Sequence, residues 1–308
     1  MNARLSRVTP RVGPGERHFG TKPTSNTEMT RGYRVSPPRP SDATELQRLH
    51  PPDNHQEGIH ATSVVVTVLL AAASLAGLVG GASLYQASPS ALVSPGGDAA
   101  NLIVTVPALL ACVWAARRGS LLGLLLLPGA LFYALYISAI YVVAGPFTPV
   151  VLGHLGVVVI SGCVIVALLA SIDRQAVRRV FTAAPARWIG GALVVIALLA
   201  YAGLFANPAA AAELGFRGQW AVDAALGTPV LLVGGLLLWR RAPLGYVTAA
   251  PLLLVSGLGG LAFAAAAVLD RLLGGSAIDP TVVAVHLGIF VIDVVLLTVL
   301  IRHPRSKH

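Results

Sequence analysis

The sequence predicts an all-α integral membrane protein with eight transmembrane helices, arranged as two parallel four-helix repeats with both termini in the cytoplasm. Three observations lead to this prediction: an apolar composition, a close series of long apolar segments from residue 61, and an ordered set of motifs that recurs in the second half. The chain divides accordingly into a tail over residues 1–60, a first repeat over 61–180, and a second repeat over 181–308 that ends in a short cytoplasmic C-terminus.

The composition excludes an ordinary water-soluble fold. Among the 308 residues, 55% are hydrophobic and 11% are charged, and the mean hydropathy is +0.75. Soluble domains carry about 25% charged residues, so a chain with so few charges must turn most of its surface toward lipid. Cys112 and Cys163 both lie within apolar segments and indicate small buried side chains, because a disulfide framework or a cysteine metal site needs more cysteines.

Residues 1–60 have a different composition, with eight prolines and little apolar clustering. Such a segment buries too little apolar surface to offset the entropy lost on ordering, so we predict a disordered cytoplasmic tail. His50, His55 and His60 recur along its end, but zinc ligands usually pair at closer spacings on an ordered scaffold. We interpret them as solvated histidines beside the membrane.

From residue 61 onward, segments long and apolar enough to form transmembrane helices follow one another closely. Such a helix needs about 20 mostly apolar residues. The uncharged stretch 119–172 is too long for one span, and a turn that contains Pro146 and Pro149 divides it into two. The predicted spans are 61–86, 100–116, 120–144, 150–172, 187–206, 220–239, 244–269 and 280–301.

The basic residues beside the predicted spans set the orientation, because cytoplasmic loops of membrane proteins carry an excess of Lys and Arg. With the N-terminus inside, the inner loops and the C-terminus hold eleven basic residues, and the outer loops hold two, Arg217 and Arg271. The eleven are Arg117, Arg118, Arg174, Arg178, Arg179, Arg187, Arg240, Arg241, Arg302, Arg305 and Lys307. This asymmetry predicts cytoplasmic termini and explains the net charge of +9 without a nucleic-acid partner. The composition, rich in Arg and Ala, is typical of a GC-rich bacterial gene, so we expect the plasma membrane of a bacterium.

The second half repeats motifs of the first half in the same order. Each half contains a proline followed by an arginine pair, then a second proline, then the triplet His-Leu-Gly. The corresponding positions are Pro107 and Pro229, Arg117-Arg118 and Arg240-Arg241, Pro128 and Pro251, and His154 and His286. Four spans per repeat is an even number, so the two repeats have the same orientation, as in parallel-repeat transporters.

Several of these motifs resemble those of a family of uncharacterised bacterial multi-pass membrane proteins. They are Asp/Asn-x5-Pro-x-Leu-Leu at Asn101 and Asp223, Arg-Arg-Gly-Ser at 117–120, the run Pro-Gly-Ala-Leu-Phe-Tyr-Ala-Leu-Tyr at 128–136, Pro-Phe-Thr-Pro at 146–149, and Ala-Ser-Ile-Asp at 170–173. The resemblance covers about residues 61–301. It implies the multi-pass architecture and no particular activity.

Asp293 and His286 are the leading candidates for an intramembrane polar site. Ionisable groups within spans are costly to bury and mark functional positions by default. Asp293 lies near the middle of the last predicted span, and His286 lies two helical turns earlier on the same face. The alternative is a protonated, purely structural Asp293 that is hydrogen-bonded to a neighbouring helix.

Four further residues complete the predicted polar site. His154 and His286 occupy matching repeat positions, so a two-fold axis bringing them together would suit haem, a metal ion or proton handling. The alternative is two ordinary histidines near the outer surface. Asn101 and Asp223 also match, and the favoured role for both is capping a helix N-terminus. Tyr136 lies deep enough that its hydroxyl needs a partner, and packing is favoured over ligand binding.

The leading functional interpretation is a transporter or permease that moves a small solute or ion through a pathway between the halves. The alternative is a membrane-embedded redox protein or enzyme that binds haem or metal, and a third hypothesis is a non-catalytic membrane scaffold. The sequence contains no Walker motif, dinucleotide fingerprint, His-Glu-x-x-His or hydrolase elbow, so we assign no catalytic residue and no metal ligand. The cofactor, the solute and the oligomeric state stay open, and the only partner that the sequence itself indicates is the lipid bilayer.

Overall fold

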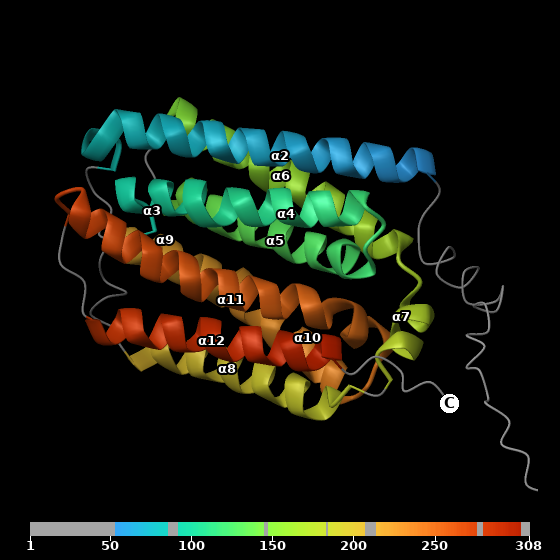
Figure 1. Ribbon diagram of the computed structural model, residues 1–308. Coiled ribbons are helices and arrows are strands. Elements are labelled where there is room, and N and C mark those ends of the chain that lie inside the picture. The colour runs from blue at the N-terminus through green and yellow to red at the C-terminus, as the bar shows by residue number, and fades with distance from the viewer. Residues whose placement is uncertain are drawn as a thin grey trace, which may run out of the picture. The chain divides into compact units, whose positions relative to one another are not determined.

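The computed structural model in Figure 1 describes residues 53–85, 92–144, 147–182, 184–206, 214–275 and 280–302. Across these ranges the regular structure is helical and contains no strand. Eight helices are long and apolar enough to cross a membrane, as predicted: Gln56–Gly80, Pro95–Arg117, Leu121–Ala144, Pro149–Ser171, Ala186–Ala206, Gly218–Trp239, Pro243–Leu272 and Pro280–Arg302. The protein is therefore an all-helical, multi-pass membrane protein.

The structure departs from the predicted boundaries at both ends of the first half. Helix α2 (Asp53–Gly80) begins inside the predicted tail, and residues 1–52 lie outside the described residues. His60 is 6% exposed within α2, so its predicted solvated position is wrong. A short helix that was not predicted, α7 (Arg174–Val180), follows the fourth span; the Asp173 side chain caps it, and Val177 anchors it in the core.

The first four spans form one group of packed helices (Figure 1). After α2 and the short η1 (Gly81–Tyr85), the second span consists of α3 (Pro95–Ala100), η2 (Asn101–Thr105) and α4 (Val106–Arg117). Helix α5 (Leu121–Ala144) packs between α4 and α6 (Pro149–Ser171). Helix α2 packs on α6 and also contacts α4, so the first and last helices of this half close against each other.

The last four spans follow the same order of elements but close differently. They are α8 (Ala186–Ala206), then α9 (Leu214–Val222), η4 (Asp223–Gly227) and α10 (Thr228–Trp239) as one bent span, then α11 (Pro243–Leu272) and α12 (Pro280–Arg302). Helix α8 packs on α10, and α12 packs on α11. Within the described part of the chain, α12 makes no contact with α8 comparable to that of α6 with α2.

The second span of each half contains one π-helical turn directly before its proline. In η2 the Val106 N–H bonds to the Asn101 carbonyl, and in η4 the Thr228 N–H bonds to the Asp223 carbonyl, both across five residues. Proline lacks an N–H and crowds the carbonyl four residues earlier, and the wider turn relieves that conflict. The two π turns lie at matching positions in the two halves.

The inner hairpins α4–α5 and α10–α11 are also built alike. Gly119 (φ 74°) and Arg241 (φ 56°) hold positive φ angles at the two turns. One turn later, Gly123 lies so close to α4 that an added Cβ would be 2.5 Å from the Ala116 nitrogen. Gly245 meets the Leu238 nitrogen of α10 in the same way.

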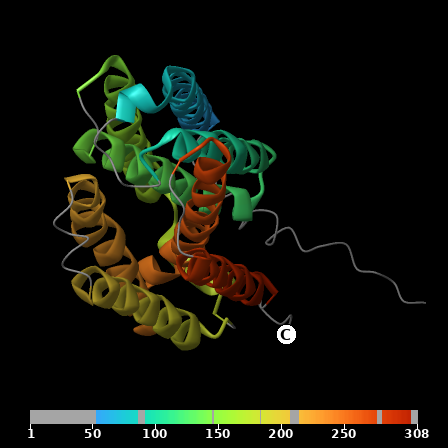
Figure 2. The same ribbon diagram turned by 90° about the vertical axis from the view of Figure 1, so that its left-hand side faces the viewer.

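Helices α5 and α11 are the most enclosed spans and join the two groups. An added Cβ on Gly129 of α5 would lie 2.5 Å from the Pro251 carbonyl oxygen and 2.8 Å from its Cα, so the two backbones touch there. Viewed along the helices, the blue-to-green helices and the yellow-to-red helices lie in two groups that meet at these elements (Figure 2). Close approach through small residues is the usual basis of helix packing in membranes.

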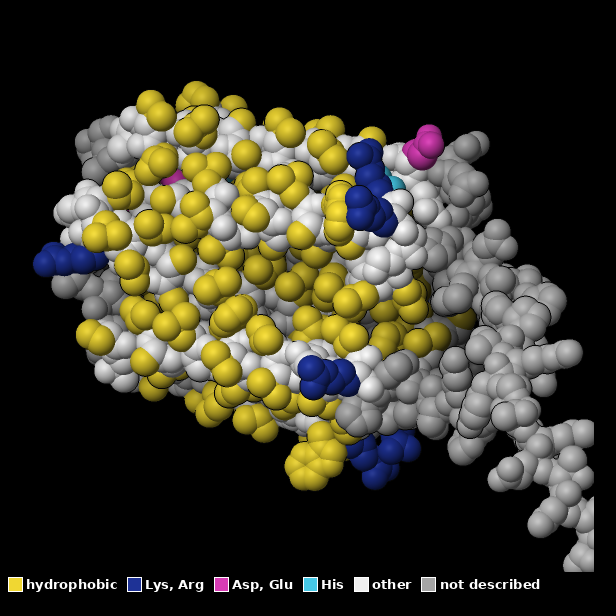
Figure 3. Space-filling model, in the orientation of Figure 1, with side chains coloured by type: hydrophobic (Ala, Val, Ile, Leu, Met, Phe, Trp, Pro, Cys, Tyr) yellow, Lys and Arg dark blue, Asp and Glu magenta, His cyan; other side chains and the backbone are white. Residues whose placement is uncertain are grey.

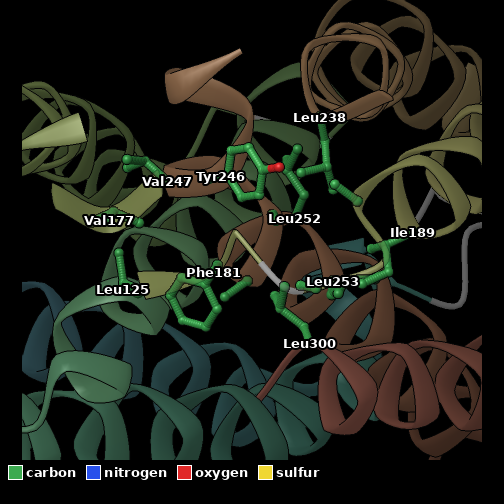
Figure 4. Packing of buried hydrophobic residues seen from close by; sticks show 14 of the residues in the cluster. Leu125, Val177, Phe181, Ile189, Leu238, Tyr246, Val247, Leu252, Leu253 and Leu300 are labelled. Atoms are coloured by element: carbon green, nitrogen blue, oxygen red, sulfur yellow. The ribbon is translucent and has the colours of Figure 1, made fainter. Parts of the chain in front are cut away.

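The largest buried apolar cluster surrounds one end of α11, where side chains from several helices meet (Figure 4). Tyr246, Leu252 and Leu253 of α11 pack there with Leu238 of α10 and Ile189 of α8. Val177 and Phe181, in and just after α7, join from the loop between the halves. This cluster holds the short helix α7 against the membrane core.

Charged and aromatic side chains mark one end of the helices, which we call the arginine end. The arginine pairs after α4 and α10, those of α7, and Arg187 and Arg302 all belong to this end, whereas Arg271 lies at the opposite end. Figure 3 shows apolar side chains covering the surface between the two ends. Trp114, Trp188 and Trp239 are exposed beside these arginines, where membrane proteins place interfacial aromatic residues.

The contact between α5 and α11 predicts a selective effect of one added methyl group. Gly129→Ala forces a Cβ into the Pro251 backbone, so we expect a loss of stability of about 1–3 kcal/mol, the usual effect of overpacking. Gly288→Ala is the matched control, because no atom lies within 4 Å of a Cβ built there. Thermal unfolding of both variants in detergent measures the difference. Equal stability of the two variants would contradict the close crossing.

Candidate functional site

Several polar side chains are almost completely buried. Residues with exposed fractions of 1% or less include Ser74, Asp98, Asn101, Ser138 and His154 in the first half and Asp293 in the second. The first five belong to a connected network. The second half holds a pocket and the isolated carboxyl of Asp293.

Asp98 is the centre of the first-half network. Tyr85 donates a hydrogen bond to its Oδ2, and Tyr141 donates one to its Oδ1 at 3.0 Å. Gly77 of α2 provides the space, since a Cβ there would collide with the carboxyl and with the Tyr85 hydroxyl. Asp98 lies inside α3, so the predicted start of the second span at residue 100 is wrong. Ser94, which caps α3, and Pro95 at its start were the available signals that the helix begins before Asp98.

His154 adjoins this network through an aromatic stack. Its ring lies 4.1 Å from the Tyr141 ring centroid at an angle of 15°, and its Nδ1 is 3.1 Å from the Ser138 hydroxyl. Its Nε2 is buried and has no hydrogen-bond partner. A haem would need open space beside that nitrogen, and the 0% exposure of His154 leaves none.

Asn101 joins the first and second spans, and its predicted capping role is wrong. Its amide donates to the Ser74 hydroxyl of α2 at 3.2 Å, and the Thr105 hydroxyl donates to its Oδ1 at 3.4 Å. The helix begins six residues earlier, at Pro95, so Asn101 lies inside a continuous span. Asp223 likewise starts a π turn inside its span and caps no helix end.

The second half contains a pocket of about 580 Å³ where α12 and α8 fail to close. Helices α8, α9, α10, α11 and α12 line it, together with η4 and two tyrosines of α5. Most of its wall is aliphatic or aromatic. Its polar groups include those of Tyr136, Gln219, Asp223, Thr228, Ser256 and His286. Three predicted residues, Tyr136, Asp223 and His286, thus line one pocket.

Tyr136 and Asp223 form the polar contact between the two halves within this pocket. The Tyr136 hydroxyl of α5 donates to Oδ1 of Asp223, which starts η4. The prediction that this hydroxyl finds a partner is confirmed. Tyr133, one turn earlier on α5, is 1% exposed, and its ring centroid lies 6.0 Å from that of Tyr136.

His286 repeats the arrangement of His154 on the other pair of helices. Its ring stacks on Phe263 of α11 at 4.0 Å and 15°, as His154 stacks on Tyr141 of α5. Its Nδ1 is 2.7 Å from the Val282 carbonyl oxygen. The two histidines therefore pack in separate halves against separate aromatic rings, and the structure does not bring them together.

Asp293 is buried on α12 without a hydrogen-bond partner. It is 1% exposed, and neither of its carboxyl oxygens has a hydrogen bond. It faces α11, where an added Cβ on Gly257 would lie 3.3 Å from the Asp293 Cβ and where Ser256 is close enough to interact. His286 and Asp293 face the same helix, as predicted, but Asp293 is not among the residues that line the pocket.

Comparisons with known proteins add no assignment: no protein-family model matches the chain, and no curated protein or solved structure matches it significantly. Among the described residues, no group of three or more His, Cys, Asp or Glu side chains is placed to hold a metal ion. The function is therefore inferred from the geometry of the pocket and of the buried carboxyls.

The two buried carboxyls at Asp98 and Asp293 predict opposite responses to the same substitution. Asp98→Leu leaves two tyrosine hydroxyls without their acceptor, so we expect a loss of about 1–3 kcal/mol. Asp293→Leu removes a carboxyl that has no hydrogen bond and replaces it with an apolar group, so stability should stay the same or rise. Thermal unfolding in detergent compares the two. A loss at Asp293 as large as that at Asp98 would reveal a hydrogen-bonding role for Asp293.

Proposed function

We propose that the protein is a permease for a small solute, built from two like-oriented four-helix repeats, with the pocket between α8 and α12 as its solute site. The observation that carries this proposal is the pocket itself. It reaches into the membrane region, has about 580 Å³ of space, and places a few polar groups within a mostly apolar wall. That combination is typical of small-molecule sites.

Three matched features support an internal duplication. Each half has a π turn before the proline of its second span, a positive φ at its inner hairpin, and a histidine of its last helix stacked on an aromatic ring of the preceding helix. Tyr141 and Phe263, which carry the two stacks, lie the same 122 residues apart as Asn101 and Asp223. Parallel repeats recur among membrane transporters, and the analogy supports the class of protein without identifying its solute.

The difference between the halves supports the choice of the pocket. In the first half α2 packs on α6, and Gly153 lies so close that an added Cβ would be 3.3 Å from that of Ala73. In the second half the equivalent helices, α8 and α12, stay apart and leave the pocket between them. Because α12 packs mainly on α11, a movement of α12 toward α8 would enclose a bound solute.

We also propose that Asp293 takes part in solute movement. A carboxyl without a hydrogen bond near the middle of a span is costly, and such groups mark ion and proton pathways. Its helix, α12, also carries His286 into the pocket. The runner-up function, a redox or haem protein or a membrane enzyme, would use the free Nε2 of His154, which is enclosed on all sides.

The arginine end is proposed to face the cytoplasm of a bacterial cell, which puts both termini inside. Reporter fusions after Ser88, Pro146, Ala210 and Ala277 should then report an outside position, and fusions after Gly119, Thr182 and Ala242 an inside one. The physical reason is the excess of arginine beside the inner turns. A consistent reversal of the pattern, or an odd number of crossings, would contradict the proposed orientation.

Filling the pocket provides the direct test of the permease function. Gly203 lines the pocket, and no atom lies within 4 Å of a Cβ built there, so Gly203→Phe should fold normally while it occupies solute space. Gly191→Phe is the control, because Gly191 is equally open on the same helix and does not line the pocket. We expect vesicles with the wild type or the control to take up a member of a small-solute panel, and Gly203→Phe to lose uptake at least tenfold.

The same uptake assay tests Asp293, since Asp293→Asn should preserve folding and lower uptake. Uptake that does not differ between wild-type vesicles and protein-free vesicles for every solute would overturn the permease proposal. Haem or metal that co-purifies with the protein and is lost in His154→Ala would support the runner-up function.

A further inference from the structure

The pocket holds one carboxyl, that of Asp223, on its described wall. Asp223 accepts a hydrogen bond from Tyr136 and interacts with Gln219, and both are neutral. Among the described residues that line the pocket, none is Lys or Arg. Besides Asp223, the ionisable side chains among the described lining residues are Tyr133 and Tyr136 of α5 and His286 of α12. The same elements also carry Tyr201 of α8, which donates to the Ala224 carbonyl, Arg217 of α9 and Asp293 of α12. An ionised carboxylate there lacks a permanent counter-charge, which is costly in the membrane region.

The wall around this carboxyl has the chemistry of an organic-cation site. The rings of Tyr133, Tyr136, Trp220 and Phe263 line the pocket together with Asp223. Aromatic faces attract cations, and a carboxylate adds a full opposite charge. An anionic solute would be repelled by the same carboxylate. A hydrated inorganic cation does not match a cavity of about 580 Å³ that is mostly apolar and offers one carboxyl.

The pocket also opens sideways toward the lipid. Leu199 of α8 and Val285 and Ile292 of α12 line it, and they are 66%, 56% and 50% exposed. These aliphatic side chains border the gap between the two helices. A solute with an apolar body can therefore enter from the bilayer and place its charged group at Asp223.

The first half has neither a carboxyl at the position that matches Asp223 nor a comparable opening. Asn101 stands at the position that matches Asp223, and it carries no charge. In that half α2 packs on α6 and leaves no comparable gap. The carboxyl and the lateral opening thus occur together in the second half, as expected if both serve the same ligand.

Resting on the permease function, we propose that the pocket binds an amphiphilic organic cation and that this cation exchanges for a proton on Asp223. With the pocket empty, the carboxyl holds a proton. When an ammonium, guanidinium or phosphonium group arrives, the O–H bond breaks, the proton leaves to water, and the carboxylate pairs with the cation. One positive charge enters and one leaves, so the net charge of the site stays constant and the desolvation cost of an unpaired ion is avoided.

The test uses the full-length protein in detergent and three probes of similar size and different charge: tetraphenylphosphonium, triphenylphosphine oxide and tetraphenylborate. Isothermal titration in two buffers of different protonation enthalpy measures both affinity and proton release. We expect the cation to bind at least tenfold more tightly than the neutral or anionic probe and to release close to one proton. Its affinity should fall about tenfold for each pH unit on the acid side, because protons then compete for the carboxylate.

Asp223→Asn should weaken binding of the cation at least tenfold and abolish the dependence on pH. Asp98→Asn is the control, because Asp98 is a buried carboxyl that does not line the pocket. His286→Gln tests whether the imidazole causes the pH dependence of cation binding, since a protonated imidazole would also repel a cation. A pH dependence that survives Asp223→Asn and disappears in His286→Gln overturns the exchange at Asp223.

The remaining outcomes separate this proposal from the permease function. Equal binding of all three probes, lost in Gly203→Phe and unchanged in Asp223→Asn, overturns the cation class and leaves the pocket as a solute site. Failure of the cation to bind also overturns the cation class. Failure of every probe to bind, together with no uptake of any solute, overturns both proposals.

Discussion

The close crossing of α5 and α11 is the contact on which the rest of the structure depends. At Gly129 and Pro251 the two backbones touch, and helices of the two halves are arranged around that line. Lipid offers little hydrophobic drive for helices to associate, so contact through small residues must supply the attraction. Both central helices are consequently enclosed, and the helices around them keep one face free for lipid or for a ligand.

The crossing holds α5 and α11 together at the centre, so the two halves differ mainly in how their outer helices pack. Small residues on α6 let α2 close the first half, where Ser74 bonds Asn101 and Gly77 makes room for Asp98 and Tyr85. Helix α8 makes no such closure with α12. A polar network therefore fills the first half, and open space remains in the second. The polar residues follow this difference, since hydrogen bonds satisfy Asp98 twice while Asp293 has none.

The eight spans were predictable because a membrane helix needs only length and apolar content, and both are properties of the sequence alone. The start of the second span was not predicted, because residues 95–98 have the composition of a loop, and its only helix signals are the cap at Ser94 and Pro95 at the first helical position. The pairing of Tyr136 with Asp223 joins residues 87 positions apart, so no local pattern contains it. The pocket was not predictable either. It lies where α8 and α12 do not pack against each other, and no local sequence pattern indicates the absence of that contact.

The matched positions 101 and 223 hold different residues, an asparagine and an aspartate, and this difference links the architecture to the chemistry. Asn101 and Asp223 begin equivalent π turns; Asn101 bonds Ser74 within its own half, and Asp223 accepts from Tyr136 of the other half. In the closed half the position holds an amide, which hydrogen-bonds with the Ser74 and Thr105 hydroxyls without any change of charge. In the open half it holds a carboxyl, whose charge state can change when a ligand arrives through the gap. In the proposed duplication, one copy of the scaffold keeps the fold rigid while the other is free to bind.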